Sequence, residues 1–373
     1  MKIALVHDYL KEYGGAESVF ETISDIFPDA DIYTALYCPR FFGPHRSRLE
    51  KKWQGRVHQS FFQFIPFVHK IISPLRFLSP LAFRSFDFSG YDLIISSATG
   101  AFFPNALNKK SAKLICYCHT PPRYLYGLVT ARSLDSWFYK LINLPLQIIL
   151  HFYRLLDYTF AQNVDQFIAN SATTSARIKK YYRRDSIIIN PPVDIDKVSS
   201  PLIKEGGRGD FYLTGGRLAR AKRYDIAIQA CNQLKVPLKV FGRDFAGYES
   251  ELRKIAGPTI EFLGEVNQLQ KSQLLSQAKA FIFCSDNEDF GIVSVEAQAG
   301  GCPVIGFASG GIKETVVDGK TGVLFDQLTP ESCADAVKKL QKLHLKSADC
   351  LANAQKFTPE KFIQKIKSLI NLN

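Results

Sequence analysis

Two glutamates separated by seven residues flank a stretch that could bind a phosphate. Glu288 stands just before Phe290 and Gly291, and Glu296 follows in a run of small and apolar residues that predicts a helix beginning near Val293. The first amides of a helix have no partner inside it and lie at its positive end, so they can bind an anion. Glycine at position 291 would let that anion approach the backbone closely.

The two carboxylates suit the sugar ends of a nucleotide sugar. Carboxylate oxygens accept hydrogen bonds from hydroxyls and do not bind phosphate. An anion site between two such acceptors predicts a pyrophosphate at the helix start, with a hexose on one side and a ribose on the other. Acidic residues also favour helix N-termini for electrostatic reasons, so neither glutamate alone would be decisive. Their combination with the intervening Phe-Gly and the later Gly-Gly turn favours binding.

Two cations provide charge complementary to a diphosphate. The segment FYLTGGRLARAKRYDIAIQA predicts a strand, a Gly-Gly loop and a helix, with Arg217 and Lys222 in the loop. Facing a helix-start anion site, both would clamp a pyrophosphate and stabilise charge on the departing nucleotide. A second glycine-rich turn, at Gly14 and Gly15, follows the first predicted strand. That turn could bind phosphate or simply begin a helix.

A histidine marks the end of another predicted strand. The segment AKLICYC leads into His119, and two prolines then hold the backbone before Arg123. Ligands gather at the carboxyl ends of the strands in parallel sheets. His119 is therefore either a ligand-contacting residue or a satisfied turn residue. Arg123 is a candidate for contact with an acceptor or a phosphate.

Taken together, these motifs resemble the retaining glycosyltransferases of family 4, which have the GT-B fold. The family pattern is matched by EDFG, VEAQAGGCPV and GGIKE, and GRL-x-x-x-K is matched by the loop that carries the two cations. The run CHTPPRY is similar to the HTP-x-R-Y motif of a bacterial branch that transfers mannose and rhamnose. The resemblance covers nearly the whole chain and is most specific between residues 211 and 325.

The resemblance implies a role for each of these residues. Arg217 and Lys222 hold the diphosphate, Glu288 positions sugar hydroxyls, and Glu296 binds the ribose. The implied catalytic residues are His119, Glu288, Arg217 and Lys222. The implied donor-binding residues are Gly14, Gly15, Gly216, Arg217, Lys222, Gly242, Val266, Glu288, Phe290, Gly291, Ile292, Val293 and Glu296. The implied acceptor-binding residues are Asp8, Tyr9 and Arg123.

Alternating strand and helix patterns predict an α/β protein with two doubly wound, Rossmann-like domains. The length of 373 residues also suggests two domains. We expect residues 1–195 to form the acceptor-binding domain, the Gly-, Ser- and Pro-rich residues 196–210 a linker, and residues 211–357 the nucleotide-sugar domain. The GT-B resemblance implies that the domains face each other across a cleft. It also implies that the last helix, within residues 358–373, crosses back to the first domain.

The expected reaction is the retaining transfer of a hexose, with mannose or a related sugar from GDP favoured. The expected acceptor is a glycan or a lipid-linked glycan in cell-surface polysaccharide synthesis. No Asp-x-Asp motif stands at a strand end in the expected context, and two cations can do a metal's electrostatic work. We therefore expect no metal and no cofactor, with the nucleotide sugar as cosubstrate. The alternatives are a UDP-sugar transferase, another GT-B sugar-nucleotide enzyme such as a 2-epimerase, and a silent scaffold.

The net charge of +12 indicates an anionic partner, which could be a membrane surface, a nucleic acid or the substrate. Residues 40–86 mix aromatic and basic residues with very few acids, as segments on membrane surfaces do. They could also form an ordinary buried helical pair with solvated basic rims. Nucleic-acid binding is a remote alternative that rests on the charge alone.

The eight scattered cysteines show no disulfide framework and favour a reducing compartment. The amino end lacks the pattern of a signal peptide, and no apolar run reaches the roughly 18 residues of a membrane-spanning helix. We expect a cytoplasmic protein held peripherally at the cytoplasmic face of the membrane.

Overall fold

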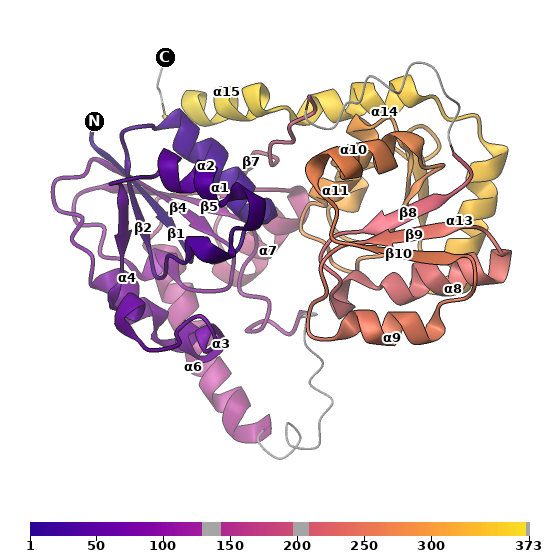
Figure 1. The fold of residues 1–373 in the computed structure, drawn as a ribbon. Coiled ribbons are helices and arrows are strands. Elements are labelled where there is room, and N and C mark those ends of the chain that lie inside the picture. The colour runs from indigo at the N-terminus through magenta and orange to yellow at the C-terminus, as the bar shows by residue number, and fades with distance from the viewer. Residues whose placement is uncertain (129–142, 197–208, 371–373) are drawn as a thin grey trace. The chain divides into compact units, whose positions relative to one another are not determined.

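The computed structural model describes residues 1–128, 143–196 and 209–370. The chain forms two compact units, each built on a parallel sheet with helices packed against it (Figure 1). Within the described residues, the first unit comprises 1–128, 143–190 and 363–370. The second comprises 191–196 and 209–362.

The first unit contains a seven-stranded parallel sheet in the order β3-β2-β1-β4-β5-β6-β7. The strand order reverses beside β1, and crevices at such reversals are where ligands bind in doubly wound folds. β4 is buried along its whole length, as a strand covered on both faces must be. The strands are β1 Ile3–His7, β2 Asp31–Thr34, β3 Val57–Gln59, β4 Leu93–Ala98, β5 Lys113–Cys118, β6 Gln166–Ala169 and β7 Ser186–Ile188.

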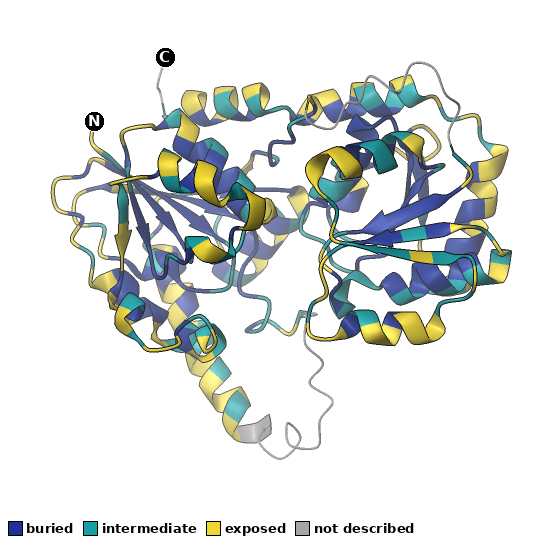
Figure 2. Cartoon of the chain, in the orientation of Figure 1, coloured by how far each residue is buried: buried dark blue, intermediate teal, exposed yellow. Residues whose placement is uncertain are grey.

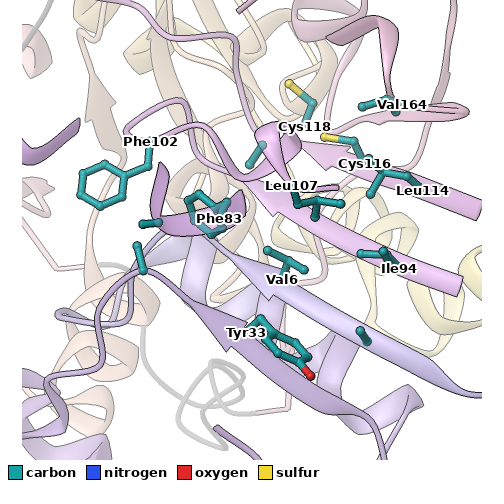
Figure 3. Close-up of a cluster of buried hydrophobic side chains, with 14 of the residues drawn as sticks. Val6, Tyr33, Phe83, Ile94, Phe102, Leu107, Leu114, Cys116, Cys118 and Val164 are labelled. Atoms are coloured by element: carbon teal, nitrogen blue, oxygen red, sulfur yellow. The ribbon is translucent and has the colours of Figure 1, made fainter. Parts of the chain in front are cut away.

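Helices of the first unit bury one apolar face each. Close to one face of its sheet, Val6, Ile94 and Leu114 pack with Phe83 and Leu107 in a continuous core (Figure 3). The α-helices are α1 Gly15–Ile26, α2 Arg46–Lys52, α3 Ile72–Leu75, α4 Ser79–Arg84, α6 Asn143–Gln162 and α7 Ala172–Tyr182. Short 3₁₀ turns, among them η3 Phe61–Phe64, η4 Arg76–Leu78 and η5 Pro104–Ala106, connect them.

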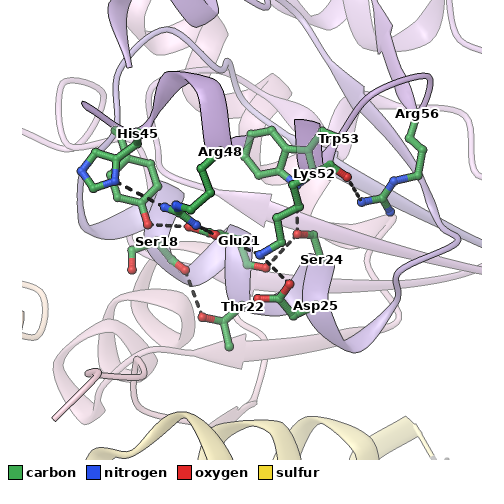
Figure 4. Close-up of polar contacts among 11 residues, drawn as sticks. Ser18, Glu21, Thr22, Ser24, Asp25, His45, Arg48, Lys52, Trp53 and Arg56 are labelled. Atoms are coloured by element: carbon green, nitrogen blue, oxygen red, sulfur yellow. Dashed lines mark hydrogen bonds and ion pairs between the residues drawn. The ribbon is translucent and has the colours of Figure 1, made fainter. Parts of the chain in front are cut away.

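Two basic residues of α2, Arg48 and Lys52, are held by acids of α1 (Figure 4). Glu21 accepts hydrogen bonds from Arg48 and from Lys52, the latter at 2.9 Å, and Lys52 also lies 2.5 Å from Asp25. Trp53 is buried behind them, and its indole N–H donates to a serine of α1. These cations of residues 40–86 therefore serve the packing of two helices.

The second unit contains a six-stranded parallel sheet in the order β10-β9-β8-β11-β12-β13. Its strands are β8 Tyr212–Gly215, β9 Leu238–Phe241, β10 Ile260–Gly264, β11 Phe281–Phe283, β12 Val304–Phe307 and β13 Gly322–Phe325. Its helices are α8 Tyr224–Leu234, α9 Tyr248–Ile255, α10 Gln268–Gln277, α11 Ile292–Ala299, α12 Ile312–Thr315, α13 Pro330–Lys342 and α14 Ser347–Ala354. The last helix, α15 Pro359–Ile370, begins in the second unit and continues in the first.

The division between the units comes earlier than the boundary expected at residue 195. Val193 donates its backbone N–H to the carbonyl of Phe357 at 2.7 Å, and Val193 and Ile195 are buried in the core of the second unit. Removing these apolar side chains from water in the core of the second unit is favourable, so the segment belongs to that unit. Most of the expected linker, residues 197–208, lies outside the described residues.

All eight cysteines lie within the described residues, and none of them forms a disulfide. Each is buried. No helix in the described ranges is both long and apolar enough to span a bilayer.

Candidate active site

The loops that follow β8 and β9 approach each other backbone to backbone. Gly216 and Gly242 have φ angles of +128° and +136°, and a Cβ on Gly242 would lie 1.7 Å from the carbonyl oxygen of Gly216. The amide of Gly242 also donates to the carbonyl of Gly264 at the end of β10, at 2.7 Å. Only glycine fits between these loops, so position 242 shapes the sheet edge where Val266 and Arg217 also lie.

Lys222 and Glu288 form an ion pair at the same sheet edge. Lys222 ends the 3₁₀ turn Arg220–Lys222, and its Nζ lies 2.6 Å from Glu288 Oε2. The hydroxyl of Ser285, just beyond β11, donates to the same carboxylate oxygen at 2.7 Å. The lysine side chain is 30% exposed and the glutamate side chain 16%, so the pair remains within reach of a ligand. The fold thus joins a cation and a carboxylate that are far apart in the sequence.

The start of α11 leaves backbone amides without a helical acceptor, and the phosphate contact expected there stays a prediction. Gly291 precedes the helix with φ +87°, a conformation that glycine adopts readily, and the helix begins at Ile292, one residue before the predicted start. The amides of Ile292 and Val293 fall in the first turn, where no helical acceptor exists. Phe290 is buried and its ring packs against Phe357, which anchors the loop.

Glu296 lies in the second turn of α11 and is paired with a residue that sequence reasoning missed. Lys271 on α10 places its Nζ 2.6 Å from Glu296 Oε2, and both side chains are less than one-fifth exposed. Lys271 belongs to no recognised motif, so only the packing of α10 beside α11 reveals the pair. The two lysine–glutamate pairs define this part of the site.

Arg217 is exposed and lies on the loop between β8 and Lys222. Its guanidinium stands over the ring of Phe245, 5.2 Å from the ring centroid. A cation over the face of an aromatic ring is attracted by the negative potential of that face. The arrangement is compatible with binding an anionic ligand at the carboxyl end of β8.

In the first unit, His119 is held at the carboxyl end of β5. Its Nε2 lies 3.0 Å from Ser97 Oγ on β4, and Ser97 Oγ lies 3.0 Å from Nδ1 of His7 at the end of β1. Burial, and secondarily the charge of His7, lower the pKa of His119 to about 3. The imidazole is therefore neutral at physiological pH, and its hydrogen bonds depend on its tautomer.

Two side chains of α7 hold the turn after His119. Thr174 Oγ1 donates to the carbonyl of His119 at 3.1 Å, and Arg177 donates to Thr120 Oγ1 at 3.0 Å. Both come from α7, and neither was predicted from the sequence. Arg123 follows on the same turn and is partly exposed.

Asp8 has a different position from the acceptor contact that we expected. Its side chain is fully buried, and Oδ2 accepts hydrogen bonds from Thr99 Oγ1 at 2.6 Å and from the amides of Ala101 and Phe102 at 3.1 and 3.0 Å. Burial raises the pKa of this carboxyl. Asp8 shapes the loop after β4 because its carboxylate points into the protein. Tyr9 packs its ring against Phe102.

The glycine-rich turn of the first unit begins a helix. The exposed Gly14 donates its amide to Glu17 Oε2 at 2.9 Å, and α1 starts at the exposed Gly15. A glutamate at the third helical position that binds this amide is a known helix-initiating contact. The helix-start interpretation of this turn is therefore confirmed, and the turn's contact with phosphate stays a prediction.

Two family models match successive parts of the chain. The model described as Glycosyltransferase Family 4 matches residues 13–197, and the model described as Glycosyl transferases group 1 matches residues 203–357. The chain belongs to the family 4 glycosyltransferases. The predicted family is confirmed, and the specific branch indicated by CHTPPRY stays a prediction.

Curated relatives and solved structures are similar to this glycosyltransferase over long stretches. Human alpha-1,3/1,6-mannosyltransferase ALG2 is 26% identical over 317 residues, which cover 74% of this chain and 72% of the human protein. A D-inositol 3-phosphate glycosyltransferase of Nocardioides sp. is 28% identical over 211 residues, covering 47% of this chain and 46% of that protein. Anabaena HepE, solved with UDP, superposes with a TM-score of 0.72 at 20% identity, covering 100% of both chains. With the two parallel sheets, this superposition confirms the GT-B fold.

We predict that Lys222→Ala weakens the binding of a nucleoside diphosphate. Loss of one charge-assisted contact should lower the affinity for GDP or UDP about tenfold to a hundredfold. The melting temperature should stay close to that of the wild type, because Ser285 still donates to Glu288. Calorimetric titration and thermal unfolding measure the two effects.

The matched control is Lys338→Ala, which removes an exposed lysine on α13 that pairs with Asp335 at 3.0 Å. It should leave the affinity unchanged. Equal affinities for the two variants would remove Lys222 from the diphosphate site.

Proposed function

We propose that this glycosyltransferase transfers a hexose, with retention at the anomeric carbon, from a GDP-sugar to a glycan or lipid-linked acceptor in cell-surface polysaccharide synthesis. Mannose or a related sugar is favoured. The observation that carries the proposal is the Lys222–Glu288 pair beside the first amides of α11. The similarity to mannosyltransferases such as human ALG2 supports the choice of sugar.

The groups of the second unit can divide the donor between them. Lys222 and Arg217 would hold the diphosphate together with the amides that begin α11, and Glu288 would accept hydrogen bonds from the hexose hydroxyls. Glu296, held by Lys271, would accept hydrogen bonds from the ribose. Positive charge beside the diphosphate stabilises it as a leaving group. Electrostatic stabilisation of this kind is usually the largest contribution to catalysis in such sites.

The bond changes follow from this arrangement. The bond between the anomeric carbon and the diphosphate oxygen breaks, and its electrons leave with the nucleoside diphosphate. An acceptor hydroxyl would form the new bond to the anomeric carbon, and its proton would pass to an oxygen of the departing diphosphate. The neutral His119 of the first unit would contact the sugar, and Arg123 and Tyr9 would contact the acceptor.

A UDP-sugar is the second candidate donor. Its support is the similarity in fold to Anabaena HepE, which was solved with UDP and with UDP-glucose. The residues after β9 and β10 that would face the base, Gly242 and Val266, do not distinguish guanine from uracil.

We expect GDP-mannose to be consumed in a screen of GDP- and UDP-sugars. The proposed site binds a diphosphate and a hexose, and the similarity to mannosyltransferases favours mannose as that hexose. Donor hydrolysis and transfer to lipid-linked glycans would be followed by mass spectrometry, with Glu288→Gln as the control that keeps the side-chain shape. Loss of the carboxylate's charge should lower turnover about 10²-fold or more. Turnover of UDP-sugars alone would establish the second candidate.

We also expect turnover to persist in excess chelator. Lys222 and Arg217 can supply the positive charge that a divalent cation provides in other transferases. The measurement is the rate of sugar transfer in EDTA, with added Mn²⁺ as the comparison. Activity that disappears in EDTA and returns with Mn²⁺ would contradict metal independence.

Membrane contact is proposed for a surface that combines part of residues 40–86 with one face of α6. Arg48 and Lys52 of α2 pair with Glu21 of α1. Exposed positions occur along η3, η4, α4 and α6 (Figure 2), and several of them are large apolar residues. We call the following side chains the apolar surface: Phe61, Phe64, Phe67, Ile71, Leu78, Leu81, Ile148, Ile149, Phe152, Leu155 and Leu156. Phe64 is 86% exposed, which for a phenylalanine indicates a binding role.

The apolar surface has one part within residues 61–81 and one part on α6, and the elements that carry these two parts contact each other. Tyr153 of α6 donates its hydroxyl to the carbonyl of Phe77 at 2.7 Å, and their rings lie 4.7 Å apart. No acidic residue occurs between Glu50 and Asp87, whereas Lys70, Arg76 and Arg84 lie in this interval. Apolar side chains beside cations without acids match a bilayer that carries anionic lipids. We propose that this surface holds the enzyme at the cytoplasmic face of such a membrane.

The double variant Phe64→Ser/Phe152→Ser should reduce binding to vesicles of phosphatidylglycerol and phosphatidylcholine at least tenfold, because two exposed rings lose contact with lipid. Flotation measures the bound fraction. Leu269→Ser on α10 is the control, since this leucine is 68% exposed in the second unit. Unchanged flotation of the double variant, or no binding by the wild type, would reject the membrane surface. A dimer that the double variant loses would instead assign the surface to a second copy of the chain.

A further inference from the structure

Four polar side chains form a buried line across three parallel strands of the first unit. Glu17 Oε1 on α1 lies 3.7 Å from Nε2 of His7 at the end of β1. His7 Nδ1 and His119 Nε2 each lie 3.0 Å from the hydroxyl of Ser97 on β4. His7 and Ser97 are fully buried, and His119 is 8% exposed. The two fully buried side chains therefore lie between Glu17 and His119, each of which is 8% exposed.

The hydroxyl of Ser97 gives this line a direction. A hydroxyl has one proton, so Ser97 donates to one imidazole and accepts from the other. If it donates to His7, then His119 carries its proton on Nε2 and leaves Nδ1 as an acceptor. If it donates to His119, then His119 carries its proton on Nδ1 and offers a donor.

Glu17 decides between the two directions. Its Oε2 accepts from the amide of Gly14 at 2.9 Å, and its Oε1 lies 3.7 Å from His7 Nε2, a buried atom without a hydrogen-bond partner among the described residues. A carboxylate favours a protonated nitrogen opposite it, and with the proton on Nε2 the other ring nitrogen of His7, Nδ1, can accept from Ser97. The opposite direction would place a second proton on a fully buried ring, and the 3.7 Å separation from Glu17 is longer than a charge-assisted hydrogen bond.

We propose that His7 and Ser97 are positioning residues that fix His119 in the Nε2–H tautomer, so that its Nδ1 accepts a hydrogen bond from a hydroxyl of the bound sugar. The proposal rests on the proposed function for the sugar contact, but the tautomer itself belongs to the protein alone. The lowered pKa of His119 is consistent with it, because a neutral ring can act as an acceptor.

The full-length protein with ¹⁵N-labelled histidines tests the tautomer directly, since the ¹⁵N shift separates protonated from unprotonated ring nitrogens. His119→Asn assigns the signals of His119. In the wild type we expect a protonated Nε2 and an unprotonated Nδ1 for His119. A protonated Nδ1 would overturn the proposal.

Ser97→Ala and Ser97→Thr test the link. Ser97→Ala should give His119 a mixture of tautomers and lower kcat/KM for the donor about tenfold, the effect of one lost hydrogen bond. Ser97→Thr keeps the hydroxyl and should restore both readouts. The control is Ser96→Ala, at the residue that precedes Ser97 on β4. Ser96 is equally buried, and this variant loses the hydrogen bond from Ser96 to Asn105.

Identical tautomer signals in Ser97→Ala and Ser96→Ala would overturn the proposal. A tautomer change in Ser97→Ala from a protein that turns over no nucleotide sugar would support the link while rejecting the proposed function. The two failures are thus distinguishable.

Discussion

Parallel strand pairing is the constraint on which both units depend. Each neighbouring pair in the two sheets runs parallel, so every strand of a sheet ends at the same edge. The register of the first unit places His7 opposite Ser97 and Ser97 opposite Tyr117. Residues that are 90 positions apart in the chain therefore become neighbours, and side chains in the loops after the strands meet at one edge.

In each unit, carboxylates near the ends of the strands are paired with other groups of the protein. Glu288 has Lys222 and Ser285, Glu296 has Lys271, and Glu17 has the amide of Gly14. Such pairing limits the rotamers of long side chains before a ligand binds, and a preorganised site loses less entropy on binding. Because these pairs are partly exposed or at a sheet edge, their value is in orientation more than in stability.

Much of the fold could be predicted from local patterns. The buried strand at 281–283, the glycine before α11 and the terminal amphipathic helix follow from apolar runs, backbone freedom and helical periodicity. The start of α11 was one residue off, because the ends of helices depend on hydrogen bonds that sequence does not show. Asp8 was assigned to an acceptor because the sequence does not reveal that the loop from Thr99 to Phe102 folds over its carboxylate.

The pairs that involve distant elements needed the tertiary structure. Nothing local marks Lys271 as the partner of Glu296 or Ser97 as the link between two histidines, since each contact joins different elements. The role of the basic residues in 40–86 was also ambiguous until Arg48 and Lys52 of α2 were seen to pair with Glu21 and Asp25.

From its sequence alone, this protein is recognisable as a two-domain α/β glycosyltransferase with two cations, two glutamates and a histidine at strand and helix ends, because these signals are short and local. Only the tertiary structure decided which side chains meet and which of them are buried. The physical reason is that such contacts depend on the register and packing of strands and helices that are far apart in the chain.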